Sequence, residues 1–287
     1  YSVLDKGEEG YTISQRLQSY AANLQGELAE SAPMINTPLR DVMPWTSLED
    51  GVHDDARMKL VTKSRGTQVS PTAMAAVNKL QAVKFVVSPT IVSIVDEYAS
   101  MLLTEMQPLI QGTQEELNKY EELQNARNTA LYLKALSFKG GDFSFGVTMD
   151  WRTRMYYRCG QAQPQGSNLE KAAFQFSRYM PMSDEALEGM RIHVANELGR
   201  DKVSYNARIA FMKNEGWRIA QEIAANPTVA TASKYVKRDK CFTALAGCVE
   251  YVRVVSEYMN NMMVWDGIES NLVCHQDGTC NGIQHSA

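Results

Sequence analysis

The sequence has no long apolar run and no repeat. No uninterrupted apolar stretch approaches the ~18 residues that a membrane span needs, and no signal peptide opens the chain. The charge is modest and no segment is of low complexity, which excludes a disordered or collagen-like chain. We therefore expect a globular protein of 287 residues that contacts no membrane and is long enough to form two lobes.

Paired cysteines and a basic excess are also lacking. The five cysteines form no Cys-x-x-Cys pair, which argues against a disulfide framework or a structural zinc site and favours a reducing cytoplasm. The formal net charge is −4, whereas an autonomous nucleic-acid-binding domain usually carries a positive excess. An acidic balance still allows nucleic acid to bind on one concave face, with positive potential supplied by a partner.

The first 140 residues or so read as helical. Apolar residues three or four apart predict a helix from Thr12 to Glu30, and the pattern resumes between about Thr72 and Met106, where Pro89 divides it into two helices. Thr113-Gln114-Glu115-Glu116 matches a capping box and predicts a third helix that runs towards Leu136. Its Glu- and Gln-rich faces are interpreted as solvated surface.

After Gly140-Gly141 the spacing of the apolar residues changes from one typical of a helix to one typical of a strand. Apolar residues alternate with small or polar ones from Phe143 to Trp151, as in a half-buried strand. Helices are predicted over 185–198, 206–225 and 241–263, and the apolar run 272–274 leads into Asp277-Gly278. The fold class is therefore α+β, with a helical lobe over 1–140 and an α+β lobe over 141–287.

The C-terminal segment 275–287 carries the most chemical information. A carboxylate at the end of a buried strand, followed by glycine, can supply oxygen ligands to a hard cation such as Mg²⁺. One carboxylate cannot build a two-metal site, so a second acid must come from elsewhere. Local chemistry alone favours the simpler interpretation that Asp277-Gly278 is an ordinary turn after a strand.

A resemblance to a known family changes that balance. Residues 277–285 read Asp-Gly-Thr-Cys-Asn-Gly-Ile-Gln-His. They resemble motif A of the single-subunit, phage- and mitochondrial-type DNA-dependent RNA polymerases, Asp-Gly-Ser-Cys-Ser-Gly-Ile-Gln-His. The resemblance implies that Asp277 is a catalytic Mg²⁺ ligand and that the carbonyl of Gly278 faces the metal. Thr279 and Cys280 would lie beneath the nucleoside triphosphate, and residues 141–287 would form part of a right-hand polymerase palm, an antiparallel sheet with flanking helices.

A second segment, 149–156, reads Met-Asp-Trp-Arg-Thr-Arg-Met-Tyr. Two arginines at i and i+2 on a strand point to the same side and can contact phosphates, and a tyrosine can stack on a base. On composition alone, a solvent-facing strand is an equally good interpretation. The segment is similar to the family's Met-Asp-Trp-Arg-Gly-Arg-Val-Tyr, which implies that Arg152, Arg154 and Tyr156 contact the RNA–DNA hybrid. Thr153 departs from the family's glycine.

Further likenesses lie between these two motifs and before them. Residues 192–196 and 199–203 resemble the family's Ile-His-Gly-Ala-Asn and Val-Asp-Lys-Val, so Lys202 would reach the incoming triphosphate and Asp201 would orient neighbouring basic groups. Taken alone, Asp201-Lys202 is a surface charge pair, and His193 is a core histidine. Residues 164–168 resemble the family's Pro-Gln-Gly-Asn-Asp and are interpreted as a polar turn. Weaker likenesses occur at 43–46 and 78–81, before a thumb-like region.

Two of the family's motifs do not occur in the sequence. It has no Tyr-Gly after an Arg-x-x-x-Lys fingers helix and no His-Asp-Ser; His53-Asp54-Asp55 precedes motif A and is interpreted as a polar loop. A basic cluster at Lys234, Lys237, Arg238 and Lys240 could approach DNA phosphates, or be a solvated helix start. The incomplete set of motifs favours the smaller, motif A-bearing subunit of a split heterodimeric phage polymerase.

The resemblance thus implies specific partners and a cofactor. A second subunit would carry the fingers helix and His-Asp-Ser and supply the second ligand set for two Mg²⁺ ions. Template DNA, RNA product, nucleoside triphosphates and a helper DNA-binding protein would be the other partners, in the cytoplasm of an infected bacterium. The alternatives are a non-catalytic nucleic-acid-binding or scaffold subunit that retains a polymerase palm, and a fragment of a single-chain polymerase.

Overall fold

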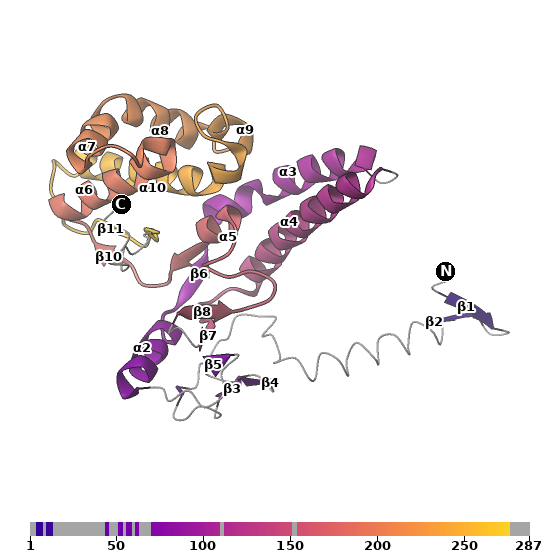
Figure 1. Ribbon diagram of the computed structural model, residues 1–287. Helices are drawn as coiled ribbons and strands as arrows, with labels where there is room; N and C mark the ends of the chain where they lie inside the picture. The colour runs from indigo at the N-terminus through magenta and orange to yellow at the C-terminus, as the bar shows by residue number, and fades with distance from the viewer. Residues whose placement is uncertain are drawn as a thin grey trace, which may run out of the picture. The chain divides into compact units, whose positions relative to one another are not determined.

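The computed structural model describes residues 4–7, 10–13, 44–45, 51–53, 56–58, 61–62, 70–109, 112–150 and 154–275. This part of the chain is mostly helical with short, mainly antiparallel strand pairs, which confirms the α+β class (Figure 1). The α-helices are α2 (Pro71–Gln81), α3 (Pro89–Met106), α4 (Gln114–Lys139), α5 (Asn168–Ala173), α6 (Asp184–Ala195), α7 (Tyr205–Lys213), α8 (Glu215–Ala225), α9 (Val229–Ala232) and α10 (Cys241–Asn260). No helix among the described residues is long and apolar enough to cross a membrane.

Short helical turns and strands complete the described elements. The turns are η1 (Gln107–Leu109) and η3 (Arg238–Lys240), both 3-10, and the π-helical η2 (Asn196–Arg200). The strands are β1 (Leu4–Gly7), β2 (Gly10–Ile13), β3 (Gly51–His53), β4 (Ala56–Met58), β5 (Val61–Thr62), β6 (Phe85–Val87), β7 (Gly146–Asp150), β8 (Met155–Arg158), β9 (Phe174–Phe176), β10 (Met180–Pro181) and β11 (Glu269–Ser270). They pair as β1-β2, β3-β4, β5-β7-β8, β6-β9 and β10-β11, with β5-β7 parallel and the others antiparallel.

The chain folds into two compact units, and each is assembled from two separate segments. Unit 1 combines residues 1–82 with 145–160, and unit 2 combines 83–144 with 161–287. The sequence instead predicts a single boundary near residue 140. That expectation treats the chain as two consecutive lobes. In the structure, β7 pairs with β5 of the N-terminal segment and with β8, so both β7 and β8 belong to unit 1, and most of the second half belongs to unit 2.

Unit 1 has a small core in which two distant segments meet. Trp45 is buried with Val77, Val147 and Met149. The Asn78 side chain binds the backbone of Trp45 twice, through Oδ1 to the amide at 2.7 Å and through Nδ2 to the carbonyl at 2.9 Å. Gln81 Oε1 accepts hydrogen bonds from Trp45 Nε1 at 3.2 Å and from the Val147 amide at 3.0 Å. Trp45, from one segment of weaker family likeness, is thus in direct contact with Asn78 and Gln81, from the other.

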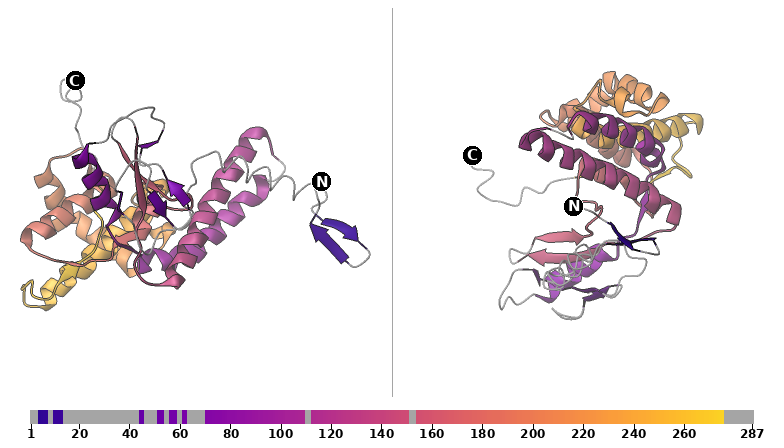
Figure 2. Two further views of the ribbon diagram at one scale, coloured as in Figure 1. Left: turned by 90° about the horizontal axis from the view of Figure 1, so that it is seen from below. Right: turned by 90° about the vertical axis from the view of Figure 1, so that its right-hand side faces the viewer.

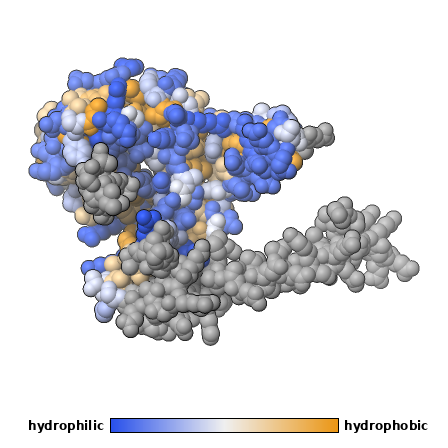
Figure 3. All heavy atoms as spheres, viewed as in Figure 1, coloured by the Kyte–Doolittle hydropathy of each residue, from blue (hydrophilic) through white to orange (hydrophobic). Residues whose placement is uncertain are grey.

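Unit 2 begins with strand β6 and a helical hairpin. Pro89 does not end the first of the two predicted helices: α2 ends at Gln81, β6 follows, and Pro89 is at the N-terminus of α3, where its missing amide costs no hydrogen bond. α4 begins after Thr113 with both hydrogen bonds of the predicted capping box. α3 and α4 lie side by side (Figure 2), and the face of this hairpin seen in Figure 3 is mostly hydrophilic, as the sequence predicts.

The remaining helices of unit 2 pack around α10. Its first eight residues, Cys241 to Cys248, are all buried, and Tyr251 lies edge-on to Trp217 of α8 with ring centroids 5.6 Å apart. The single helix predicted over 206–225 is two helices, because Asn214 leaves the helical conformation at φ −124° and ψ −102°. The predicted end of α8 before Pro227 is confirmed, and α10 ends at Asn260 rather than Met263.

Four further sequence predictions are corrected. Thr12 and Ile13 belong to strand β2 and do not begin a helix, and His53 ends strand β3 instead of lying in a loop. The run 272–274 has no strand conformation, since β11 covers only Glu269–Ser270. Residues 143–149 are all buried, so the alternating pattern there does not give the predicted exposed face.

Candidate functional site

The turn between η2 and α7 carries Asp201 and Lys202. Lys202 Nζ lies 2.9 Å from Asp201 Oδ2, and the Lys202 side chain is 88% exposed. Arg208, on α7, donates from Nη2 to the Asp201 carbonyl at 2.7 Å and from Nε to the Val203 carbonyl at 2.9 Å. Its guanidinium thereby fixes the backbone on both sides of Lys202, and the ammonium group is presented to solvent.

Positive charge surrounds this turn. The pKa of Asp201 is lowered, first by the hydrogen bond from Lys202 and further by the charges of Lys202 and, from η3, Lys240. Asp201 therefore stays ionised at neutral pH and can hold the Lys202 ammonium in place. The predicted roles of Asp201 and Lys202 in nucleotide binding stay predictions; of the two, Lys202 has the positive charge and the exposure suited to a triphosphate.

The segment that leads to residue 277 is anchored as far as His275. Asn271 and Phe176 exchange two hydrogen bonds, from Asn271 Nδ2 to the Phe176 carbonyl at 2.8 Å and from the Phe176 amide to the Asn271 carbonyl at 3.2 Å. His275 Nε2 lies 3.1 Å from the carbonyl of Lys171 in α5, and since a carbonyl only accepts, Nε2 carries the proton. Asp277, Gly278, Thr279 and Cys280 lie outside the described residues.

Three side chains near these two segments form a largely buried polar network. Thr243 Oγ1, near the start of α10, donates to Glu197 Oε2 in η2, and Glu197 Oε1 lies 4.0 Å from Nδ1 of His193. His193 is buried, as the sequence predicts for a core histidine, and burial is the main reason why its pKa is lowered. The sequence interpretation contains neither Glu197 nor Thr243, because an acid and a threonine far apart in the chain show no local pattern.

A pocket of about 410 Å³ joins the two predicted segments. Its lining includes Arg208, which holds the Lys202 turn, and His275, which precedes Asp277 by two residues; the others are Gly189, Ile192, His193, Asn196 and Tyr205. The buried Oδ1 of Asn196 has no hydrogen-bond partner. Arg208, which fixes the backbone around Lys202, and His275, which precedes Asp277, therefore line the same pocket.

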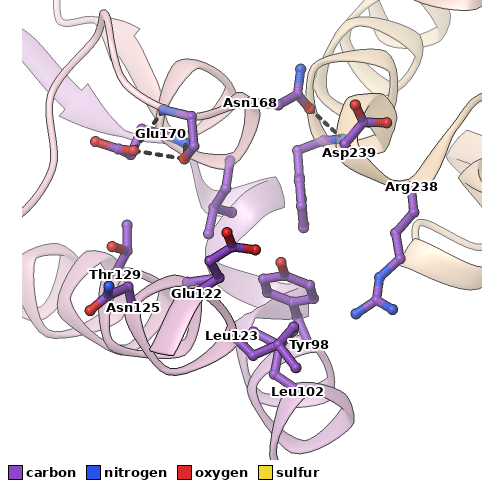
Figure 4. A pocket seen from close by; sticks show the side chains of 14 residues that line it. Tyr98, Leu102, Glu122, Leu123, Asn125, Thr129, Asn168, Glu170, Arg238 and Asp239 are labelled. Atoms are coloured by element: carbon purple, nitrogen blue, oxygen red, sulfur yellow. Dashed lines mark hydrogen bonds between the residues drawn. The ribbon is translucent and has the colours of Figure 1, made fainter. Parts of the chain in front are cut away.

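A larger pocket of about 670 Å³ lies between α3, α4, α5 and the start of α10 (Figure 4). Its apolar wall includes Leu102 and Leu123, and Arg238 at its edge binds Glu105 at 2.5 Å. In the basic cluster, interpreted from the sequence either as a contact to DNA phosphates or as a solvated helix start, Arg238 and Lys234 thus form partly exposed ion pairs, Lys234 with Glu222 at 3.0 Å. Asn168 also lines this pocket, and its dashed hydrogen bond in Figure 4 runs to the backbone of α10.

Asn168, interpreted from the sequence as the last residue of a polar turn over 164–168, is instead the first residue of helix α5. The polar turn at 164–167 ends at Ser167, which caps α5 with Glu170 in a complete capping box. Ser167-Asn168-Leu169-Glu170 carries the sequence signal for that box, so the start of α5 could have been found. The contact of Asn168 with α10 could not, because its partners are about 75 residues away in the sequence.

The arginine segment belongs to the β7–β8 hairpin of unit 1. Arg154 is exposed and directly precedes β8, so it lies in the connection and not within the predicted strand; Arg152 lies outside the described residues. Tyr156 pairs with Thr148 of β7 and is 39% exposed. Met155 and Tyr157 pack against the core of unit 1, so Tyr156 points to the opposite face of the hairpin.

The described residues do not by themselves form a metal site. Among them, no group of three or more histidine, cysteine, aspartate or glutamate side chains is placed to hold an ion. The carboxylate of Asp277 and the carbonyl of Gly278 are oxygen donors, the type that Mg²⁺ prefers. They fit one part of such a site, and further acids would have to complete it.

Comparison with known proteins gives a consistent family. Residues 180–287 match the family model described as DNA-dependent RNA polymerase. The DNA-directed RNA polymerase of Pseudomonas phage phiKMV is 32% identical over 156 residues, 54% of this chain and 18% of that protein. T7 RNA polymerase of Escherichia phage T7 is 31% identical over 141 residues, 49% of this chain and 15% of that protein.

The similarity extends to mitochondrial enzymes. The mitochondrial DNA-directed RNA polymerase of Schizosaccharomyces pombe is 28% identical over 155 residues, which are 53% of this chain and 13% of that protein. This chain therefore spans less than a fifth of the length of these relatives. The matched region of the family model contains both Lys202 and Asp277.

Proposed function

We propose that this chain, which is similar to phage- and mitochondrial-type DNA-dependent RNA polymerases over about half of its length, supplies part of the catalytic centre for DNA-directed RNA synthesis. The observation that carries the proposal is the 410 Å³ pocket. It is lined both by Arg208, which binds the backbone around Lys202, and by His275, two residues before Asp277. Both residues lie inside the family match.

The two segments have complementary roles in this proposal. Lys202 binds the triphosphate of the incoming nucleotide as a mobile point charge, and Asp201 holds the ammonium group in position. Thr279 and Cys280, which follow Asp277 in the sequence, would contact the nucleotide. The carboxylate of Asp277 and the carbonyl of Gly278 would bind Mg²⁺, which, when bound, neutralises the charge that develops on the transferring phosphate.

The reaction is nucleotidyl transfer. The 3′ hydroxyl oxygen of the RNA attacks the α-phosphorus of the nucleoside triphosphate and loses its proton, the bond to the β-phosphate oxygen breaks, and pyrophosphate leaves with that electron pair. Lys202 contributes by holding the β- and γ-phosphates, which become the leaving pyrophosphate, to a similar degree in the bound nucleotide and in the transition state.

The hairpin of unit 1 would contact nucleic acid. Tyr156 is exposed and can stack on a base, and Arg154 follows Arg152 by two residues, so both can reach backbone phosphates of the RNA–DNA hybrid. Template DNA and RNA are the ligands proposed for this hairpin. Residues 1–140 would include a thumb-like region, represented by the α3–α4 hairpin, and residues 141–287 a portion of the palm.

The rest of the catalytic centre must come from polypeptide outside these 287 residues. Neither Tyr-Gly nor His-Asp-Ser occurs in the sequence, and a two-metal site requires a second acid. A second subunit with the fingers helix and His-Asp-Ser would complete the site, and so would the remainder of a longer chain. The complete polymerase is this chain together with either the second subunit or the remainder of the longer chain. An intact-mass measurement on native material distinguishes these two possibilities.

Asp277→Asn tests the proposal. In the complete polymerase, this variant should reduce RNA synthesis by a factor of at least about 10³, because an amide cannot replace a carboxylate metal ligand, while binding of template DNA is retained. Asp266→Asn, an exposed acid near the start of the same segment, is the matched control and should keep full activity. Wild-type synthesis by Asp277→Asn would contradict the proposal and favour a non-catalytic scaffold subunit.

A further inference from the structure

The N-terminus of α10 is capped by a side chain from another element. The residue before α10, Lys240, makes no side-chain cap. Asn168 Oδ1, from the first turn of α5, instead accepts hydrogen bonds from the amides of Phe242 at 3.0 Å and Thr243 at 3.1 Å. These amides belong to the first turn of α10, where no intrahelical partner exists, so Asn168 joins α5 to α10 at a defined register.

The same asparagine begins a longer chain of hydrogen bonds. Its Nδ2 donates to Thr243 Oγ1 at 2.8 Å, and that hydroxyl donates its own proton to Glu197 Oε2. Thr243 is 5% exposed and the Glu197 side chain 18%, so both bonds are largely shielded from water. A charge-assisted bond in such a setting is stronger than a neutral one and more sensitive to the loss of a partner.

The two ends of this hydrogen-bond network lie near the two candidate segments, the turn with Lys202 and the segment that precedes Asp277. Glu197 lies in η2, which continues through Gly199, at φ +79°, directly into Asp201 and Lys202. Asn168 lies one helical turn before Lys171, whose carbonyl binds His275. A shift of α5 or α10 would therefore change the separation between the lysine turn and the segment that enters Asp277.

We propose that Asn168, Thr243 and Glu197 act as positioning residues that hold Lys202 at the triphosphate. The inference rests on the proposed function. It adds that these three residues do not contact the nucleotide themselves and act on it only through the position of Lys202. Thr243 is its central member, because it accepts from Asn168 and donates to Glu197. Removing the Thr243 hydroxyl loosens η2 from α10 and lets the Lys202 turn move away from its ligand.

Thr243→Val removes the hydroxyl and keeps the shape of the side chain. The Michaelis constant for nucleoside triphosphates should rise about tenfold, while kcat changes less than about twofold, because the ground state and the transition state lose the same contact. Thr243→Ser restores the hydroxyl and should return the Michaelis constant to near its wild-type value. Thr231→Val is the matched control: Thr231 is equally buried, and its hydroxyl is hydrogen-bonded to Asn226 and Thr228 at the start of α9, outside this set of bonds.

A double-mutant cycle separates positioning from a general loss of stability. If Thr243 acts through Lys202, then Thr243→Val should have no further effect on the Michaelis constant in the Lys202→Ala background. The same increase in both backgrounds would overturn the inference, as would an unchanged Michaelis constant in Thr243→Val alone. Should Thr243→Val fail to fold, Glu197→Gln, which keeps an acceptor for the hydroxyl but loses the charge, should raise the Michaelis constant about threefold.

All measurements use the complete polymerase, with nucleotide addition to a pre-annealed RNA–DNA hybrid as the assay. If wild-type protein adds no nucleotide, the proposed function fails and the positioning role fails with it. If the wild-type protein is active and Lys202→Ala raises the Michaelis constant, but Thr243→Val and Glu197→Gln do not, the proposed function stands and only the positioning role is wrong.

Discussion

Individual side chains hold the Lys202 turn through their polar groups. Arg208 binds the carbonyls of Asp201 and Val203, and its guanidinium also lies 5.0 Å from the centroid of the Tyr205 ring. Lysine at position 208 would keep the charge but could not reproduce two divergent hydrogen bonds from a planar fork. The conformation of the turn thus depends on guanidinium geometry more than on net charge.

Arg208→Lys tests this dependence. The variant should raise the Michaelis constant for nucleoside triphosphates about threefold to tenfold in the complete polymerase, since Lys202 loses its fixed backbone. Arg218→Lys on α8, an exposed arginine 3.8 Å from Glu222, is the control and should leave that constant unchanged. Equal constants for Arg208→Lys and the wild type would show that the turn is held without Arg208.

His193 should make the stability of the protein depend on pH. Burial is the main cause that lowers its pKa; the charge of Glu197 opposes the shift and that of His275 adds to it. The unfolded chain then binds a proton more readily than the folded one, so the stability present above about pH 6.5 should be lost as the pH falls below it.

Denaturant unfolding at pH 7.5 and pH 5.5 measures this effect. The free energy of unfolding should be lower at pH 5.5, and the loss should be smaller in His193→Gln, which cannot take up the proton. A wild-type free energy that rises between pH 7.5 and pH 5.5 would contradict the lowered pKa.

At the scale of elements, local signals in the sequence predicted helices better than they predicted strands. The capping box at Thr113 and the proline after α8 mark their helices correctly, because both act through neighbouring backbone groups. Strand β6 was missed, since its three residues pair with β9 about 90 residues away. Asn214, which separates α7 from α8, carries no local signal strong enough to predict a break.

The contact between α2 and β7 depends on a single buried amide. Gln81 is 1% exposed and accepts from both Trp45 Nε1 and the Val147 amide. Gln81→Leu should lower the free energy of unfolding by about 1–3 kcal/mol, because the Val147 amide loses the partner that Gln81 provides in a buried site. Gln124→Leu, on the exposed side of α4, should have little effect, and an equal loss in both variants would disprove the special role of Gln81.

At the scale of the whole molecule, the motifs indicated the family. The division of the chain into two units could be seen only in the structure. Residues 277–285 and 199–203 resemble polymerase motifs, and they lie in the region that matches the family model of DNA-dependent RNA polymerases. The division into units was not predictable, because β7 and β8 leave the second half to join residues 1–82. Nor was the capping of α10 by Asn168, which depends on packing between distant segments.

The central claim is that Lys202 faces the triphosphate of the incoming nucleotide. A nucleoside triphosphate with an amine-reactive group on its γ-phosphate, added to the complete polymerase with template and primer, tests this claim most directly. The adduct should form on Lys202, in preference to the exposed Lys213 of the adjacent α7, and excess unmodified nucleotide should prevent it. Equal labelling of Lys202 and Lys213, or labelling of Lys202 that unmodified nucleotide does not reduce, would contradict the claim.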